Sequence, residues 1–483
     1  MGKNIDMDSS DFLKTGYRFI DWINDYLTNL ENLPVLPGVK PGEIKRSLPQ
    51  SPPEQPENFD QIISDLNEII VPGVTHWNHP KFMAYFNSTS SSAGIFAELL
   101  SAAFNTNGML WKTNPASTEL EELTLNWLKE LLGLPEDFWG IIYDLASNST
   151  MHAIIAAREN VEGYSIREKG FGGVKNMPRL RLYASEQAHS SVDKSAILAG
   201  IGLEGVRKIP VDDQFKMIPS ELEKAIAEDK KNGWLPFCIV ATVGTTSTTS
   251  IDPVNEIAEI TQKENIWLHV DAAHAGIAAI VPEMRNILNG CEHADSFVVN
   301  PHKWMFMPID ISVLFTRKKE VLKQAFSLVH EYLKTDEDDE VTNFMDYGIQ
   351  LGRRFRALKL WFVIRYFGRE GLIKLIREHI RLAQELKNHI DENPNFERLA
   401  PVPLSTICFR TLNPNFSDDE GLNKFNKDLL AKINDSGELF LSHTILNGKF
   451  TIRITISGLR TEQRHVQEAW ELIDKEYKIL VNT

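Results

Sequence analysis

Two short apolar runs decide the fold: IWLHV at residues 266–270 and SFVVN at residues 296–300. Each run ends directly in polar residues, with Asp271 after the first and His302 and Lys303 just after the second. Apolar strands separated by helical segments are typical of a parallel sheet that is covered on both faces. Because the ends of such strands meet at one edge of the sheet, we expect Asp271 and Lys303 to lie close together.

Similar runs extend this pattern in both directions. They are GIIY at 140–143, RLYAS at 181–185, CIVATVG at 238–244 and ISVLFT at 311–316. Their alternation with helical segments predicts an α/β fold whose large domain holds a mostly parallel sheet. After residue 353 a long helical stretch leads to a small α+β domain. There, Asn447-Gly448 predicts a hairpin, residues 450–456 a strand with one buried face, and residues 462–478 a closing helix.

The beginning of the chain has a different character. Residues 12–27 have helical periodicity, residues 34–56 are rich in proline, and residues 58–70 form a second amphipathic pattern. A helix followed by an extended strap buries little apolar surface by itself, so we expect this arm to pack on another domain or another subunit. We therefore divide the chain into an arm (1–85), a large cofactor domain (86–355) and a small domain (356–483).

Composition excludes several classes of protein. The 483 residues include 51 Lys and Arg against 66 Asp and Glu, a net charge of −15, which argues against broad binding of nucleic acid. No apolar run is long enough to cross a membrane, and the first residues contain no apolar signal core. Three scattered cysteines fit a reducing compartment. We expect a cytoplasmic protein with neither a membrane nor a nucleic acid as its partner.

The polar residues at the strand ends suggest a particular chemistry. A lysine can form a Schiff base with a pyridoxal cofactor, and an aspartate can keep the pyridine nitrogen protonated. In the alternative interpretation, Asp271 caps a helix and Lys303 is a solvated loop residue. The spacing of the two residues alone favours this alternative. His269 and His274 lack a third ligand at suitable spacing, so we expect no metal site.

Two turns rich in hydroxyl groups favour a cofactor site over the structural alternatives. Residues 146–150, ASNST, lie between a predicted strand and a predicted helix, and Gly244-Thr245-Thr246 end another strand. Each turn alone reads as an ordinary cap or turn, but hydroxyl and backbone N–H groups at a helix N-terminus also bind phosphate. Together with Asp271 and Lys303 at the same sheet edge, the turns favour a site for pyridoxal 5′-phosphate (PLP).

Longer motifs point to a known family. They are NPASTELE (114–121), EQAHSS (186–191), ATVGTTSTTSIDP (241–253), HVDAAHAG (269–276), NPHKW (300–304) and LGRRFRALKLW (351–361). In these motifs and their order, the chain resembles the group II PLP-dependent decarboxylases, specifically the aromatic L-amino acid decarboxylases. The resemblance implies a fold-type I homodimer with shared active sites and an N-terminal arm wrapped around the partner. It also implies decarboxylation of an aromatic L-amino acid to the arylalkylamine and CO2.

The resemblance assigns roles to individual residues. Lys303 is implied to attach the cofactor, Asp271 to contact the pyridine nitrogen, His189 to stack on the ring and Ala273 to pack beneath it. The implied phosphate-binding residues are Ser147, Asn148, Ser149, Thr246, Asn300 and His302. The implied substrate pocket comprises Trp77, Tyr85, Phe86, Ser88, Asn107, Met109 and Gly352, with Asn107 and Met109 reaching into the neighbouring subunit's site. Without the resemblance, His189 would be read as a surface histidine and the three aromatic residues as core.

One position departs from the decarboxylase pattern. Decarboxylases of this family use a loop tyrosine to return a proton to Cα, and an ungapped count from LGRRFR places Phe344 at that position. Phenylalanine there implies an aromatic aldehyde synthase, which releases aldehyde, ammonia and hydrogen peroxide. Tyr332 and Tyr347 lie in or beside the same loop, and His189 is another proton carrier. We therefore place amine formation first and aldehyde formation second. A scaffold without catalysis is disfavoured because Lys303 is present.

Overall fold

The computed structural model describes residues 6–328, 333, 335–338 and 340–482. These residues fall into two compact units. The first, which we call the sheet unit, comprises Ser88–Phe409 and Thr455–Leu459. The second, the terminal unit, comprises the chain up to Asn87 together with Arg410–Ile454 and the residues from Arg460 onward.

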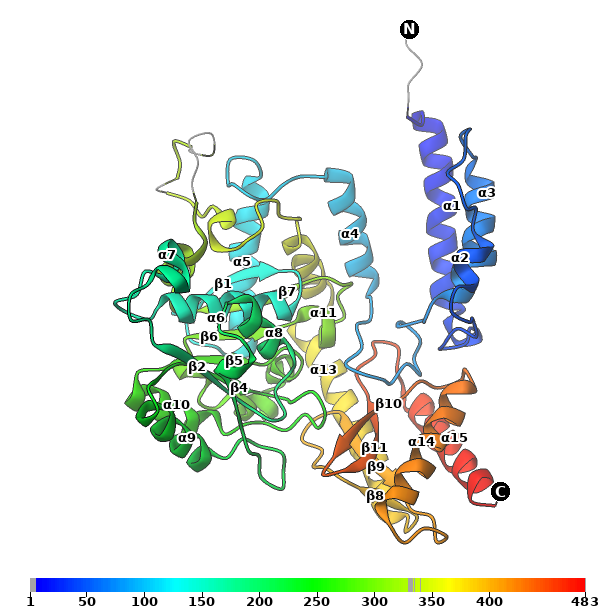
Figure 1. Cartoon of the computed structure of the whole chain (residues 1–483). Helices are drawn as coiled ribbons and strands as arrows, with labels where there is room; N and C mark the ends of the chain where they lie inside the picture. The colour runs from blue at the N-terminus through cyan, green and yellow to red at the C-terminus, as the bar shows by residue number, and fades with distance from the viewer. Residues whose placement is uncertain (1–5, 329–332, 334, 339, 483) are drawn as a thin grey trace. The chain divides into compact units, whose positions relative to one another are not determined.

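The sheet unit is built on seven strands in the order β1-β7-β6-β5-β4-β2-β3 (Figure 1). Their bounds are β1 Trp139–Tyr143, β2 Arg179–Ser185, β3 Val206–Ile209, β4 Trp234–Thr242, β5 Trp267–Asp271, β6 Ser296–Val299 and β7 Ser312–Thr316. The pairs from β6 through β5, β4 and β2 to β3 are parallel, whereas β7 is antiparallel to both β6 and β1. The predicted mostly parallel sheet is confirmed; β3 is a strand that the sequence patterns did not reveal.

Helices cover both faces of this sheet, which is why its strands are apolar on both sides. On β4, Ile239 and Ala241 pack on one face while Cys238 and Val240 pack on the other. The first face is covered by α5 (Pro115–Leu132), α9 (Pro219–Lys231), α10 (Val254–Glu264) and α13 (Ala357–Glu392). The second face is covered by α6 (Ala146–Glu159), α7 (Ile166–Gly173), α8 (Ser191–Leu198) and α12 (Lys319–Phe326). The unit also contains α4 (Ser92–Phe104) and the single-turn α11 (Pro301–Trp304).

The terminal unit combines both ends of the chain. Its helices are α1 (Ser9–Thr28), α2 (Glu43–Ser47), α3 (Phe59–Asp65), α14 (Asp419–Asp435) and α15 (Gln463–Val481). Helices α1 and α3 lie side by side, joined by an Arg18–Asp60 ion pair of 2.6 Å (Figure 1). The indole N–H of Trp22 donates to Asn67 Oδ1 at 2.8 Å just beyond α3. The predicted helices at both ends of the chain are therefore confirmed.

A separate four-stranded sheet contains β8 (Phe396–Arg398), β9 (Thr406–Thr411), β10 (Ser442–Leu446) and β11 (Lys449–Thr455) in the order β10-β11-β9-β8. The predicted hairpin is confirmed, because Asn447 and Gly448 both have positive φ and join β10 to antiparallel β11. The expectation of one buried face on this strand was wrong. Thr451, Arg453 and Thr455 are buried as fully as the isoleucines between them.

Among the described residues, no helix is long and apolar enough to cross a membrane.

Candidate active site

The carboxyl ends of β5 and β6 place the central residues of the site. Asp271 is the last residue of β5, and its Oδ1 accepts the backbone N–H of Ala273 at 3.1 Å. The backbone N–H of Asn300, which follows β6, donates to the carbonyl of Ala273 at 3.0 Å, and the Lys303 N–H donates to the carbonyl of Asn300 at 3.0 Å. These bonds tie the two predicted motifs, HVDAAH and NPHKW, into one structure.

His189, Asp271 and Lys303 each lie at or after the carboxyl end of a strand of the large sheet, namely β2, β5 and β6. His189 follows β2 and is exposed, and its Nδ1 lies 2.9 Å from the hydroxyl of Ser191. Partial burial lowers the pKa of His189, while the Asp271 carboxylate raises it and the Lys303 ammonium lowers it further. An imidazole that senses both charges lies within electrostatic reach of both groups. Asp271 is buried and Lys303 is half-buried, so the site is lined by charge but remains open on this chain.

His302 and Asn300 lie buried next to Lys303. His302 Nδ1 lies 2.6 Å from the carbonyl oxygen and 3.1 Å from the backbone nitrogen of Ile311. Burial and the Lys303 charge lower the pKa of His302 to about 4, so its imidazole is neutral at neutral pH. Asn300 Oδ1 is buried and has no partner among the described residues. Both buried side chains belong to the NPHKW motif that carries Lys303.

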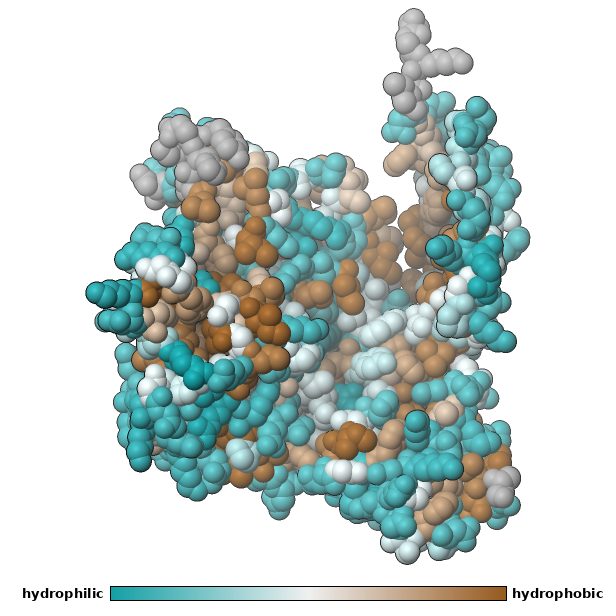
Figure 2. Space-filling view, in the orientation of Figure 1, coloured by the Kyte–Doolittle hydropathy of each residue, from teal (hydrophilic) through white to brown (hydrophobic). Residues whose placement is uncertain are grey.

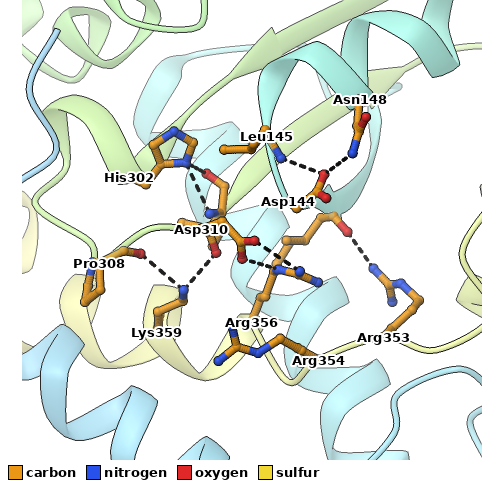
Figure 3. A network of polar contacts seen from close by, with 12 residues as sticks. Asp144, Leu145, Asn148, His302, Pro308, Asp310, Arg353, Arg354, Arg356 and Lys359 are labelled. Carbon is orange, nitrogen blue, oxygen red and sulfur yellow. Dashed lines mark hydrogen bonds and ion pairs between the residues drawn. The ribbon is translucent and has the colours of Figure 1, made fainter. Parts of the chain in front are cut away.

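Figure 3 shows a polar cluster at the start of α6, formed by Asp144, Leu145 and Asn148. Asp144 Oδ1 accepts the Leu145 N–H at 2.7 Å and the Asn148 side-chain amide at 2.6 Å. Ser147 is exposed, whereas Ser149 is fully buried and its hydroxyl lies 2.8 Å from that of Ser312 in β7. Of the two serines, the structure leaves Ser147 accessible to an anion and places Ser149 against the sheet.

The turn after β4 presents Thr246 at the surface. Gly244 has a φ of +87°, and a Cβ there would lie 2.4 Å from the Cβ of Ala275, so only glycine fits this turn. Asp252, which the sequence patterns did not single out, accepts the N–H groups of Met217 and Thr242 at 2.8 Å each. Burial raises the pKa of Asp252 to about 6. The turn that carries Thr246 runs from Thr242 to Asp252, so the bond between these two residues holds its ends together.

The predicted pocket residues fall into two groups. Ser88, Asn107, Met109 and Gly352 belong to the sheet unit, whereas Trp77, Tyr85 and Phe86 belong to the terminal unit. Asn107 Oδ1 accepts the backbone N–H of Arg353 at 2.9 Å, which joins it to the segment that carries Gly352. The carbonyl of Met109 accepts the N–H of Met345 at 3.1 Å. The Asn107–Met109 and 343–353 segments therefore lie together.

Phe344, predicted to stand in the place of the loop tyrosine, is buried in this chain. It begins a single 3-10 turn, Phe344–Tyr347, and its side chain is 1% exposed. The ring packs on Trp139 of β1, with centroids 6.0 Å apart, and under the guanidinium of Arg353. Tyr347 is also buried against Trp139. Tyr332 lies outside the described residues. The apolar Phe344 ring thus serves the core, which an ungapped count from a motif could not reveal.

The two histidines considered as metal ligands have other partners. His269 Nδ1 lies 2.9 Å from the hydroxyl of Ser296 on the neighbouring strand β6. The His274 ring stacks on Trp304, with centroids 4.8 Å apart and planes 4° from parallel. The Trp304 indole N–H donates to His379 Nδ1 at 3.0 Å, so this stack supports the residue next to Lys303.

The residues present fit PLP. A half-buried lysine can attach an aldehyde, a buried carboxylate can face a pyridine nitrogen, and the exposed hydroxyls of Ser147 and Thr246 can donate to a phosphate. The buried Asn300 Oδ1 without a described partner marks a place where a further group completes the hydrogen bonding.

Comparison with known proteins agrees with this chemistry. Residues 41–412 match the family model described as the pyridoxal-dependent decarboxylase conserved domain. The chain belongs to the pyridoxal-dependent decarboxylase family. As a member of this family it is a PLP-dependent carboxy-lyase with a fold-type I architecture.

Similar proteins include both product classes. The decarboxylase is 41% identical to tryptophan decarboxylase 2 of Oryza sativa subsp. japonica over 98% of this chain and 96% of the relative. It is 40% identical to phenylacetaldehyde synthase of Arabidopsis thaliana over 99% of this chain and 98% of the relative. The crystal structure of Oryza sativa TDC with PLP and tryptamine has a TM-score of 0.95 and 35% identity, covering 99% of this chain and 100% of that chain.

Proposed function

We propose that this decarboxylase converts an aromatic L-amino acid to the corresponding arylalkylamine and CO2. The observation that carries the proposal is the placement of Asp271 at the end of β5 and of Lys303 just after the neighbouring parallel strand β6, because the reaction needs a carboxylate and a lysine in one site. The similarity to a tryptophan decarboxylase supports an aromatic substrate.

Each residue contributes orientation or electrostatics. PLP, when bound, accepts the electron pair left on Cα as the carboxylate departs. Lys303 supplies the amine that attaches the cofactor aldehyde, and the Asp271 carboxylate favours a proton on the pyridine nitrogen. The His189 imidazole would lie against the cofactor ring and restrict water. Ser147, Thr246 and neutral His302 would hold the phosphate, with Asn148 and Asn300 close to it.

A further question is whether the enzyme releases an amine or an aldehyde. Because Phe344 is buried in the core, it does not support aldehyde formation, and that alternative rests on the similarity to phenylacetaldehyde synthase. The proton donor in our proposal is Tyr332, because the other tyrosine of this segment, Tyr347, packs under Trp139. A donor that returns a proton to Cα would lead to the amine, whereas a site without that donor would favour reaction with dioxygen and release of the aldehyde.

Product analysis tests this proposal. Purified enzyme is given L-tryptophan, L-tyrosine, L-phenylalanine or L-dihydroxyphenylalanine, and amine, aldehyde, ammonia and peroxide are quantified. We expect amine without peroxide from the wild type, and aldehyde with peroxide from Tyr332→Phe. Tyr347→Phe is the matched control and should keep the wild-type product ratio. Stoichiometric peroxide from the wild type would overturn the proposal in favour of an aldehyde synthase.

Gly352 supports a wide pocket that admits an indole ring. It is exposed, and the nearest atom to a Cβ built on it is Asn107 Nδ2 at 3.7 Å. A residue without a side chain leaves this volume to the substrate. We therefore include tryptophan among the substrates, alongside tyrosine, phenylalanine and dihydroxyphenylalanine.

We further propose a homodimer with shared active sites, in which Asn107 and Met109 reach the neighbouring subunit's site. Two helices support it, because each exposes large apolar side chains (Figure 2). These side chains are Phe12, Leu13, Tyr17 and Ile20 on α1, and Phe96, Leu99, Leu100 and Phe104 on α4. Sedimentation analysis of wild type and Leu99→Asp tests this: a monomeric wild type would contradict the dimer.

Three further assignments stay with the proposal. The net charge of −15 and the scattered cysteines support a cytoplasmic enzyme that binds neither membranes nor nucleic acid. We also propose that the chain divides by function into an arm (1–85), a cofactor domain (86–355) and a small domain (356–483).

A further inference from the structure

Lys359 is a buried lysine of α13 that contacts the backbone next to the cofactor motif (Figure 3). Its side chain is 1% exposed. The Nζ donates to the carbonyl of Pro308 at 3.2 Å and to that of Asp310 at 2.8 Å, and it forms an ion pair with Glu98 of α4. These three partners satisfy the three N–H groups of an ammonium, which is what allows its charge to be buried.

A second cation, Arg356 at the N-cap of α13, contacts the same turn. Arg356 Nε donates to Asp310 Oδ1 at 2.7 Å, so the main chain and the side chain of Asp310 are both bound by this helix. Residues 308–311 lie between α11 and β7 and form no helix or strand until β7 begins at Ser312. The position of this turn therefore depends on side-chain contacts from α13, with Lys359 as the most deeply buried.

The same turn fixes the ring of His302. The carbonyl and the N–H of Ile311 both lie at hydrogen-bond distance from His302 Nδ1, at 2.6 Å and 3.1 Å. Nδ1 is therefore engaged by the turn, and when it accepts the Ile311 N–H the neutral ring carries its proton on Nε2, which can then donate to a phosphate oxygen. A shift of Ile311 rotates or releases this ring, while Lys303 is anchored separately through Asn300.

We propose that Lys359 is a positioning residue for the cofactor phosphate, acting through the 308–311 turn and the His302 ring. The inference rests on the proposed phosphate-binding role of His302. It predicts a selective effect: loss of Lys359 weakens binding of the phosphate-bearing cofactor, whereas binding of pyridoxal, which has no phosphate, changes little.

The test compares the Kd of PLP and of pyridoxal for the full-length apoenzyme, read from the visible absorption of the cofactor bound to the protein. For Lys359→Met we expect PLP affinity to fall about tenfold, the size of one lost hydrogen bond to a charged group, with pyridoxal affinity within about twofold. Lys374→Met, an exposed lysine on the same helix, is the matched control and should change neither value. An equal fall for both ligands, or no fall for PLP, would overturn the inference.

Two further variants separate the possible failures. If His302→Gln does not selectively weaken PLP, the phosphate assignment fails and the inference fails with it. If His302→Gln is selective but Lys359→Met is not, the inference alone fails. In the His302→Gln background, Lys359→Met should lower PLP affinity little further, because both residues act through the His302 ring. Should circular dichroism show that Lys359→Met is unfolded, Lys359→Arg, which keeps the charge beside Glu98, must give the same selective loss.

Discussion

Arg353 and Glu121 form a buried ion pair, with 2.7 Å between Arg353 Nη2 and Glu121 Oε1. The same carboxylate oxygen accepts the N–H of Ile142 in β1 at 2.8 Å, and Arg353 Nη2 donates to the Ile142 carbonyl at 2.7 Å. The Arg353 guanidinium also lies 4.5 Å from the centroid of the Phe344 ring. This pair thus joins α5, β1 and the segment that carries Phe344 and Gly352.

Breaking this pair should destabilise the protein strongly. Arg353→Met leaves the Glu121 carboxylate buried without its cation, so we expect the free energy of unfolding to fall by about 3–5 kcal/mol. Urea unfolding followed by circular dichroism measures it. Arg381→Met, which removes exposed ion pairs on α13, is the control and should change stability little. Similar losses for the two variants would contradict a special role for the buried pair.

Phe344→Tyr should leave the ratio of amine to peroxide unchanged. The added hydroxyl enters a closed core, where an unpaired O–H group costs about 1–3 kcal/mol, so we expect a less stable enzyme with the same products. Product analysis and thermal unfolding of wild type and variant give both values. A shift from aldehyde to amine would instead place Phe344 at the substrate and restore its predicted role in the loop.

The two serines at the start of α6 should behave differently. Ser147→Ala removes an exposed hydroxyl and should weaken PLP binding about fivefold. Ser149→Ala removes the bond to Ser312 and should lower stability by about 1 kcal/mol while PLP affinity stays within about twofold. Cofactor titration and urea unfolding of both variants distinguish these effects. Equal loss of PLP affinity would show that Ser149 also contacts the phosphate.

Stability should decrease in mild acid because of buried histidines such as His379. Burial lowers the pKa of His379 from 6.5 to about 4, so between these values the unfolded chain binds a proton that the folded chain does not. The contribution of His379 to the free energy of unfolding is complete above pH 6.5. It is lost as the pH falls, at up to about 1.4 kcal/mol per pH unit. Urea unfolding of the apoenzyme from pH 7.5 to 4.5 should show a shallower fall for His379→Gln than for wild type. The exposed His389→Gln on the same helix should follow the wild type.

Gly352→Ser should alter substrate preference without unfolding the protein. A Cβ at this position would lie 3.7 Å from its nearest atom, so a small side chain fits locally but takes volume from the pocket. We expect kcat/KM for L-tryptophan to fall about tenfold relative to L-tyrosine. An unchanged ratio would remove Gly352 from the determinants of specificity.

Much of the site followed from local pattern. Asp271 ends β5 and Lys303 lies shortly after the neighbouring strand β6, and parallel strands bring their carboxyl ends to one edge whatever the details of packing. Apolar runs also predicted six of the seven strands of the large sheet. The exception, β3, is a short edge strand in which only Ile209 is buried, so its sequence lacks the continuous apolar character of a central strand.

Other features depend on contacts between distant segments. Phe344 has the same apolar side chain in a loop or in a core, and only its packing on Trp139 and Arg353 shows which. Ser147 and Ser149 look alike in the motif, but a helix turns them to different sides, one to solvent and one to β7.

The sequence by itself determined six of the seven strands of the large sheet, the helices at both ends of the chain and the location of Asp271 and Lys303 at one sheet edge, because periodicity and motif spacing are local properties. Only the tertiary structure decided the burial of Phe344, the pairing of Ser149 with Ser312 and the three partners of Lys359. The physical reason is that burial and hydrogen bonding depend on which distant segments meet, and a charge such as that of Lys359 is tolerated inside only where those segments supply its partners.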